Sequence, residues 1–225
     1  MNNEIAINEM THTSVKTVKV VLYHIIKRTF DIVCSLVGCL FLLPIALFIK
    51  IASILSKDYD SIFYTQDRIG KNGKIFKLYK FRSMVSNADE ILESILKEDG
   101  ELAKEYKINK KMHNDPRITK VGNFIRKTSI DELPQLINIL AGEMSFIGNR
   151  PYLPREKVDM GEYYNDIVKT KPGLTGYWQV SGRSETTFDE RLKLEQYYSD
   201  HCGLRMDIKI FFKTFKVVIC RHGAK

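Results

Sequence analysis

The chain has 225 residues and a formal charge of +8, because 35 Lys and Arg outnumber 27 Asp and Glu. The length suits one domain with some chain left for an appendage, and the basic excess predicts an anionic partner: acidic lipid, a phosphorylated substrate or nucleic acid. The four cysteines form no C-x-x-C pair and have no nearby His at metal-ligand spacing, which argues against a disulfide framework and a zinc site.

The first predicted element is a long apolar segment. Residues 32–49 carry no charge, and after Lys50 the apolar run continues to Leu55, which reaches the length of a membrane segment. A buried core helix is the alternative, but a domain of this size could hardly cover such a helix on all sides. The segment therefore predicts contact with a membrane.

The form of this segment is indicated by its proline and its flanks. Pro44 lies near the middle and predicts a kink, and basic residues precede and follow the segment in equal measure. A simple span has more positive charge on its cytoplasmic side, so the equal flanks favour a helix that returns to the same face. We assign residues 1–26 to an N-terminal extension and residues 27–56 to a proline-broken re-entrant membrane helix.

Residues 57–225 are assigned to a cytoplasmic domain, which begins with a predicted β-hairpin. Aromatic and β-branched residues on two arms flank a pair of glycines, a pattern typical of a hairpin. Lys80 and Arg82 lie on the second arm, where basic residues usually form a solvated face. The following residues, 86–112, are charged and helix-favouring, and Gly100 predicts a break among them.

The stretch TSIDELPQL, residues 128–136, contains the adjacent carboxylates Asp131 and Glu132. Ser129 and Glu132 have the spacing of a capping box, and Pro134 fits a first helical turn, so the pair can be explained as a helix start. The alternative is a reactive carboxylate with a helper, held at the positive end of a helix dipole beside cations. The spacing alone favours the capping box.

Arginines surround the carboxylate pair in the sequence and recur in two turn-rich stretches, IGNRP and KPGLTGYWQVSGRS. The planar guanidinium matches phosphate oxygens, and glycine lets the backbone approach a ligand closely. Adjacent carboxylates with several arginines indicate a magnesium-assisted phosphate site, because Mg²⁺ takes oxygen ligands and bridges to phosphate. The candidate phosphate-binding residues are Lys80, Arg82, Arg117, Arg126, Arg150 and Arg183.

The last predicted element is a helix near the C-terminus, DIKIFFKTFKVVICRH. Lys209, Lys213 and Lys216 recur at helical spacing, with aromatic and aliphatic residues between them. This pattern is typical of a helix that lies in a membrane interface, and a terminal helix packed on the domain core is equally open. Together with the apolar segment, it favours lipid over nucleic acid, for which no binding motif is present.

Taken in order, these motifs resemble the bacterial sugar transferases that act on polyprenyl phosphate, the monotopic phosphoglycosyl transferases of capsule, exopolysaccharide and O-antigen assembly. The resemblance runs from KRTFD at Lys27 to the C-terminus. It rests on the proline-broken apolar helix, YTQDRIGKNGKIFKLYKFRSM, DPRITKVGNFIRKTSIDELPQL, GEMSFIGNRP, KPGLTGYWQVSGR and the basic tail helix. The expected fold is α+β and mainly helical, with a re-entrant membrane helix, a small β-hairpin and interfacial amphipathic helices, on the cytoplasmic face of the bacterial inner membrane.

The resemblance also implies a role for each carboxylate. Asp131 would attack the sugar-bearing phosphorus of a nucleotide diphosphate sugar, release UMP and form a phosphosugar–enzyme intermediate, with Glu132 as its helper. Polyprenyl (undecaprenyl) phosphate would then accept the sugar phosphate. Mg²⁺ is the expected cofactor, held by Asp131 and Glu132, and the expected donor is a UDP-hexose carrying glucose or galactose. The oligomeric state stays open, a homodimer included.

Two positions depart from the family pattern. The common Gly-Pro-Arg-Pro loop reads Gly148-Asn149-Arg150-Pro151, which loses a rigidifying proline and keeps the arginine. Glu195 stands where an Asp is more usual, so the carboxylate is kept and its reach is changed. A catalytically inactive membrane scaffold for polysaccharide assembly is the runner-up function, and the intact carboxylate pair argues against it.

Overall fold

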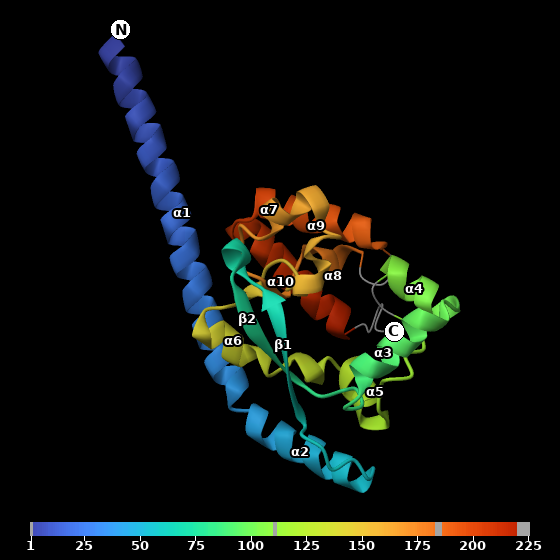
Figure 1. Ribbon diagram of the computed structural model, residues 1–225. Coiled ribbons are helices and arrows are strands. Elements are labelled where there is room, and N and C mark those ends of the chain that lie inside the picture. The colour runs from blue at the N-terminus through green and yellow to red at the C-terminus, as the bar shows by residue number, and fades with distance from the viewer. Residues whose placement is uncertain (1, 110–111, 183–185, 220–225) are drawn as a thin grey trace.

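The computed structural model describes residues 2–109, 112–182 and 186–219, with the backbone alone described for residues 2–17, 109 and 217–219. The described chain is mainly helical with a small two-stranded antiparallel sheet, which confirms this part of the expected fold (Figure 1). The elements are α1 (Asn2–Cys39), α2 (Leu42–Leu55), β1 (Phe63–Ile69), η1 (Lys71–Gly73), β2 (Ile75–Phe81), α3 (Ala88–Glu98), α4 (Glu101–Asn109), α5 (Lys120–Lys127), η2 (Ile130–Glu132), α6 (Gln135–Ala141), β3 (Ser145–Ile147), η3 (Pro154–Lys157), η4 (Gly161–Tyr163), α7 (Tyr164–Ile167), β4 (Gly173–Thr175), α8 (Tyr177–Ser181), α9 (Phe188–His201) and α10 (Leu204–Ile219), where η marks a 3-10 turn. A short parallel pair, β3 with β4, was not predicted.

The predicted hairpin is confirmed as β1 paired antiparallel with β2 along their whole length. Asn72 and Gly73 have positive φ at its turn, a conformation that Gly and Asn adopt more readily than other residues. The Asn72 amide donates to the carbonyl of Val168 at 2.7 Å. The tip of the hairpin is therefore fastened to the segment that leads into β4.

One face of the hairpin packs on α6. Phe76 and Leu78 of β2 join Leu136 and Ile139 of α6 in a buried cluster. Because side chains alternate along a strand, Lys80 shares the face of Phe76 and Leu78. Lys80 thus faces the body of the protein, and the expected solvated face does not include it.

The charged segment predicted to be helical forms α3 and α4. The chain turns between them at Asp99, which has a φ of 48°, and at the predicted break, Gly100. Leu92 and Ala103 are the buried residues of this pair. Figure 1 places both helices on the opposite side of the body from α1.

The apolar segment forms the second half of α1 and all of α2, with a bend of 46° between the two helices. Among the described residues no single helix has the length and hydropathy of a membrane span, whereas Val18–Cys39 and Leu42–Leu55 reach them as a pair. The break lies at Leu40 and Phe41, one turn before Pro44, which is in the first turn of α2. That Pro44 causes the bend stays a prediction, and α1 continues without a break between residues 26 and 27.

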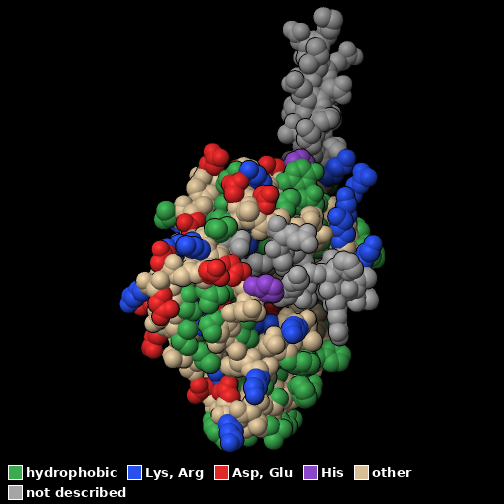
Figure 2. Space-filling view, turned by 90° about the vertical axis from the view of Figure 1, so that its right-hand side faces the viewer, with side chains coloured by type: hydrophobic (Ala, Val, Ile, Leu, Met, Phe, Trp, Pro, Cys, Tyr) green, Lys and Arg blue, Asp and Glu red, His purple; other side chains and the backbone are tan. Residues whose placement is uncertain are grey.

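Many apolar side chains of this helix pair face outward. Leu40, Leu43 and Leu55 are each 75–80% exposed, and Figure 2 shows hydrophobic side chains along the lower edge of the molecule, at the height of α2. Large exposed apolar patches mark sites of contact with a membrane or with another protein. The exposure is what the membrane prediction requires.

Polar contacts fasten α1 to the body. The buried carboxylate of Asp31 accepts from Ser145 Oγ at 3.0 Å and from the Phe146 amide at 2.9 Å. Arg28 donates to the carbonyls of Ile139 and Leu140 at 2.6 and 2.8 Å, which satisfies free acceptors at the C-terminus of α6. The first half of the apolar helix pair is therefore attached to the body of the protein.

The C-terminal helix, α10, packs on α1 and also exposes apolar side chains. Asp207 of α10 accepts from Lys27 and Tyr23 of α1, and Ile210 is buried. Phe212 is nevertheless 67% exposed. One face of α10 thus packs on the body, and its role at a membrane interface stays a prediction.

Candidate active site

Asp131 and Glu132 lie on η2, between α5 and α6. Asp131 is buried, with 8% of its surface exposed, and Glu132 is partly exposed. Lys80 of β2 faces both carboxylates: its Nζ lies 2.9 Å from Glu132 Oε1 and 3.9 Å from Asp131 Oδ2. The hairpin and the turn therefore bring together three of the residues that the sequence singled out.

The capping box considered for this stretch does not form, so that explanation is wrong. Ser129 has a φ of 57° and its side chain makes no cap hydrogen bond, and α6 begins only at Gln135. The Glu132 carboxylate bonds to Lys80 instead of reaching back to the Ser129 amide. A partner from a distant strand has taken the carboxylate that the capping box would need.

Burial dominates the electrostatics of Asp131. It raises the pKa of that carboxyl to about 6; the nearby Glu132 adds to the rise, while Lys80 and Arg126 oppose it. A helix dipole would lower the pKa of Asp131, but burial outweighs that effect. The helix that follows the pair, α6, is also short and begins only at Gln135. Asp131 is thus a poorly hydrated carboxylate that titrates near pH 6.

Glu132 has the opposite shift. Burial pushes its pKa up, but Lys80, Arg150 and Arg68 outweigh that effect and hold the pKa of Glu132 below its ordinary value. At neutral pH Glu132 is ionised and paired with Lys80. The two adjacent carboxylates therefore differ in chemical character, as environments that separate two pKa values allow.

A small cavity opens beside Glu132, and Asp131 does not line it. Arg150, from the loop after β3, and Arg68, from β1, line it together with Lys80 and Glu132. The remaining lining residues are Leu78, Gln135, Pro151, Gly173, Leu174 and Gln179. Three cations around one ionised carboxylate leave an excess of positive charge, which suits a ligand with phosphate groups.

The loop that carries Arg150 is anchored on α9. The Arg150 amide donates to Glu195 Oε2 at 2.9 Å. Asn149 Nδ2 donates to Ser199 Oγ at 2.6 Å and also to the carbonyl of Ile167 at 3.1 Å. The proline missing from the family's loop is thus replaced by an asparagine that fixes the loop through its side chain.

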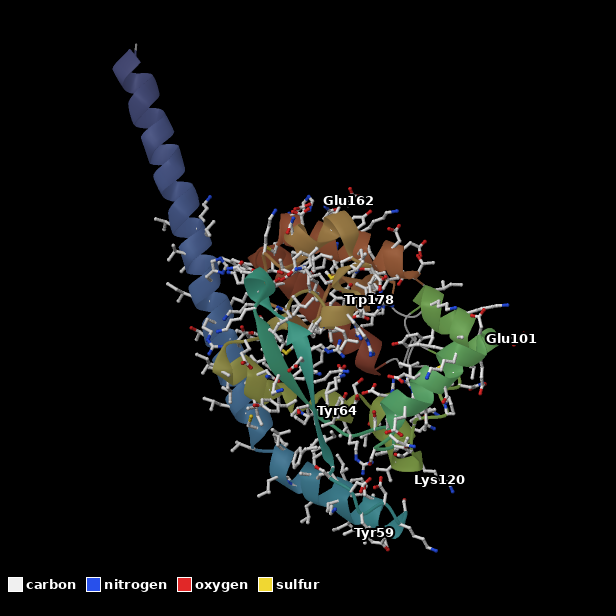
Figure 3. The ribbon with its side chains drawn as sticks, viewed as in Figure 1. Tyr59, Tyr64, Glu101, Lys120, Glu162 and Trp178 are labelled. Carbon is white, nitrogen blue, oxygen red and sulfur yellow. The ribbon has the colours of Figure 1, made fainter. Side chains whose placement is uncertain are left out.

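The Arg150 side chain is directed by an aromatic ring. Its ζ carbon lies 5.8 Å from the centre of the Trp178 ring, on which Arg191 also stacks at 4.3 Å, and Figure 3 shows Trp178 in the middle of the body. The buried Nε of Arg150 has no hydrogen-bond partner among the described residues. A buried donor without a partner needs an explanation. A hydrogen bond to an oxygen of a bound substrate would supply one.

Arg68 is a site residue that the sequence analysis missed. It is buried and donates to the carbonyl of Pro151 at 2.8 Å and to Gln66 Oε1 at 2.6 Å, so it clamps the Arg150 loop from the other side. Burial, reinforced by Arg150, lowers its pKa to about 10. No sequence signal separates Arg68 from other basic strand residues, because its burial depends on the loop that folds over it.

Two predicted phosphate-binding residues have local carboxylate partners. Arg117 makes a bidentate pair with Asp115, at 2.8 and 2.7 Å. Arg82 donates to Asp58 at 2.6 Å and to the carbonyl of Ser61, which fastens the end of β2 to the loop after α2. Both guanidinium groups are occupied in structural contacts, and neither lines the cavity.

The other two arginines have different positions. Arg126 is exposed in the last turn of α5, and its charge reaches Asp131, whose pKa it lowers. Arg183 lies outside the described residues. The structure therefore groups Lys80, Arg126 and Arg150 with the carboxylate pair.

The carboxylate pair fits Mg²⁺ only in company with a substrate. Within residues 18–108, 112–182 and 186–216, whose side chains the structure describes, no group of three or more His, Cys, Asp or Glu side chains could hold a metal ion. Mg²⁺ is usually bound by one or two carboxylates plus phosphate oxygens and water. Asp131 and Glu132 supply that number of protein ligands.

Comparison with known proteins finds similarity to one family, the bacterial sugar transferases. The model of the bacterial sugar transferase family matches residues 22–221. The chain is 44% identical over 202 residues to the undecaprenyl-phosphate galactose phosphotransferase of Salmonella typhimurium, covering 88% of this chain and 41% of that protein. It is 37% identical over 203 residues to the UDP-glucose:undecaprenyl-phosphate glucose-1-phosphate transferase of Escherichia coli, covering 84% and 39%.

A shorter relative is covered almost completely. The chain is 39% identical over 202 residues to the exopolysaccharide production protein ExoY of Rhizobium meliloti, covering 88% of this chain and 87% of that protein. The chain thus spans about two fifths of the Salmonella and Escherichia proteins and most of ExoY.

Proposed function

The chain belongs to the bacterial sugar transferase family, and we propose that it is a phosphoglycosyl transferase that moves a hexose-1-phosphate from a UDP-hexose to undecaprenyl phosphate, as the first step of exopolysaccharide, capsule or O-antigen synthesis. The names of its relatives refer to undecaprenyl phosphate and to galactose or glucose transfer. The observation that carries the proposal is the buried Asp131 beside an ionised Glu132, with Lys80 between them and two arginines lining the adjoining cavity.

In the first step, an oxygen of the Asp131 carboxylate attacks the sugar-bearing phosphorus. The bond from that phosphorus to the bridging oxygen breaks, and UMP leaves with the electron pair of that bond. With a pKa of about 6, Asp131 is mostly ionised at pH 7, and its burial means that little hydration is lost when it attacks. Lys80, Arg68 and Arg150 would offset the charge of the diphosphate.

In the second step, an oxygen of undecaprenyl phosphate attacks the same phosphorus and the Asp131 carboxylate is expelled. The acceptor is a membrane lipid, so the site must lie at a membrane surface. The exposed apolar faces of α1, α2 and α10 support contact with a membrane, and we assign the body to the cytoplasmic face of the bacterial inner membrane.

Asp131 and Glu132 would hold Mg²⁺ together with oxygens of the diphosphate. When bound, the ion would supply positive charge to the departing phosphate. Glu132 has a further task that needs no metal, because its bond to Lys80 keeps that cation facing Asp131.

Release of UMP from a panel of UDP-sugars, with undecaprenyl phosphate in detergent, tests this function. We expect one or more UDP-hexoses to give UMP, and Glu132→Gln to lower kcat by about 10²-fold or more. Glu98→Gln, an exposed carboxylate of α3, is the control and should retain full activity. No UMP from any UDP-sugar would favour the inactive scaffold.

A further inference from the structure

Four basic side chains gather on one side of α1 and form what we term the α1 basic cluster: His24 and Arg28 of α1, Lys71 of η1 and Lys171 of the segment before β4. Arg28 Nη2 and Lys171 Nζ flank Gly142, lying 3.6 and 3.7 Å from the point where its Cβ would be. The bond from the Asn72 amide to Val168 holds the hairpin tip against the segment that carries Lys171. None of the four residues lines the cavity beside the carboxylate pair.

The cluster has few carboxylate partners among the described residues. Among the residues that the structure describes, Arg28, Lys71 and Lys171 have no ion pair. Three acids near the cluster have other partners. Asp31 accepts from Ser145 and the Phe146 amide, Asp207 pairs with Lys27, and Glu143, next to Gly142, accepts from Asn138 Nδ2. Arg28 itself caps carbonyl groups of α6.

The members of the cluster repel one another. Burial lowers the pKa of Lys171, and the nearby Arg28, Lys71 and Lys27 lower it further, while Asp31 opposes them. Burial likewise lowers the pKa of His24, together with Lys71, Lys27 and Lys171. A bound anion would relieve this repulsion.

An apolar strip adjoins the cluster. A shallow groove on α1 is lined by Val21, His24, Ile25, Arg28 and Thr29, and Val21 and Ile25 are 52% and 57% exposed. Less than one turn beyond Thr29, the chain enters the apolar run that begins at Ile32. A ligand for this surface therefore needs an anionic end and an apolar body.

We propose that the α1 basic cluster binds the phosphate headgroup of an acidic glycerophospholipid, whose acyl chains enter the bilayer beside the apolar run that begins at Ile32. Arg28 Nη2 and Lys171 Nζ lie on the same side of Gly142 and would face the phosphate together, and Lys71 would add positive charge from the hairpin tip. The proposal rests on the membrane placement of the proposed function and not on its chemistry. A bound lipid would tie α1, the hairpin and the segment before β4 to the bilayer surface.

Competition between lipids on the purified full chain tests the site. Native mass spectrometry from detergent would compare retention of phosphatidylglycerol and phosphatidylcholine by the wild type, by Lys71→Gln/Lys171→Gln, and by the charge-matched control Lys97→Gln/Lys104→Gln on the exposed sides of α3 and α4. At about fivefold per lysine near a membrane surface, the cluster variant should lose roughly 25-fold in preference for phosphatidylglycerol. The control should keep the preference of the wild type.

Equal losses in both variants, or no loss in the cluster variant, would overturn the proposal. Nuclear magnetic resonance gives a second readout, because phosphatidylglycerol nanodiscs should raise the pKa of the His24 imidazole and phosphatidylcholine nanodiscs should not. If millimolar inorganic phosphate in detergent gave the same rise, the site would be one for free phosphate and the lipid assignment would be wrong. These measurements need no UDP-sugar, so a protein that shows the lipid preference but releases no UMP would refute only the proposed activity.

Discussion

Asp131 and Glu132 are neighbours in the chain but have opposite pKa shifts. Lys80 lies 2.9 Å from the Glu132 carboxylate and 3.9 Å from that of Asp131, so the more exposed carboxylate receives the closer cation. Asp131 has the greater burial and the weaker compensation. Under the proposed mechanism, this difference would give a nucleophile that is ionised yet poorly hydrated, beside a partner that stays charged.

The burial of Asp131 has a stability consequence. Its folded-state pKa of about 6 exceeds the unfolded value of about 3.9, so ionisation favours the unfolded state as pH rises from about 4 to 6. At pH 7.5, without Mg²⁺ or substrate, Asp131→Asn should increase the free energy of unfolding by about 1–3 kcal/mol, and it should abolish turnover. Thermal unfolding at pH 7.5 and pH 4 measures this, and the difference should shrink at pH 4. A variant less stable than the wild type at pH 7.5 would contradict the burial account.

The same pKa predicts the pH dependence of the reaction. Because Asp131 must be ionised to attack, kcat/KM for UMP release should rise as pH increases through about 6. In Glu132→Gln the remaining activity should rise at a lower pH, since Glu132 is one cause of the raised pKa. Measuring kcat/KM for UMP release between pH 5 and pH 8 in the wild type and in Glu132→Gln tests both expectations. A flat profile in both proteins would mean that Asp131 does not limit the rate.

Arg150 allows a test of phosphate recognition. Arg150→Lys should lower kcat/KM for the UDP-sugar by about 10²-fold, because an ammonium cannot reproduce the forked donors of a guanidinium. Arg117→Lys is the comparison, since Arg117 is held by Asp115 outside the cavity; its effect should fall on stability. Equal kinetic losses in the two variants would remove the distinction that the structure makes between them.

At the scale of elements, the loop from Gly148 to Pro151 depends on α9. Glu195, fully buried, has its pKa raised to about 8 by burial and accepts from the Arg150 amide. Glu195→Ala should leave that amide unpaired, at a cost of about 1–3 kcal/mol of stability, and should raise KM by displacing Arg150. Glu195→Gln keeps an acceptor and should retain most activity. Identical kinetics for Glu195→Ala and Glu195→Gln would show that the bond from the Arg150 amide to Glu195 does not position the loop.

The elements also show which features the sequence could predict. The hairpin, the break near Gly100 and the bent apolar pair follow from local patterns of alternation, glycine and hydropathy. The capping box failed because Lys80, about fifty residues earlier in the chain, takes the Glu132 carboxylate. Arg117 could have been assigned a structural role, since Asp115 stands two residues before it. The burial of Arg68 could not be predicted from the sequence, because it depends on a loop more than eighty residues away.

The bent pair α1–α2 carries the topological prediction. If the segment is re-entrant, both ends lie on one face, and single cysteines at Lys19 and Lys57, without the native cysteines, should resist an impermeant thiol reagent in intact cells and react after permeabilisation. Pro44→Ala should restore a continuous helix and shift the protein toward a spanning form that exposes Lys19 outside. Labelling of the unmutated protein at Lys19 from outside would show an ordinary transmembrane helix.

At the scale of the whole molecule, the apolar and catalytic parts are joined by a few buried polar contacts. Asp31 and Arg28 connect α1 to β3 and α6, and Asp207 connects α1 to α10. The element that would enter the membrane is thereby attached to α6, the helix that follows the carboxylate pair. This attachment would hold the site at the height where a lipid phosphate is found.

The central claim is that Asp131 carries the sugar phosphate between donor and acceptor, and intact-protein mass spectrometry tests it most directly. With the preferred UDP-hexose and no acceptor, the wild type should gain the mass of one hexose phosphate and release one equivalent of UMP. Digestion should place the adduct on the peptide containing Asp131, undecaprenyl phosphate should remove it, and Asp131→Asn should not form it. UMP release that requires both substrates together and leaves no adduct, or an adduct on another residue, would contradict the account.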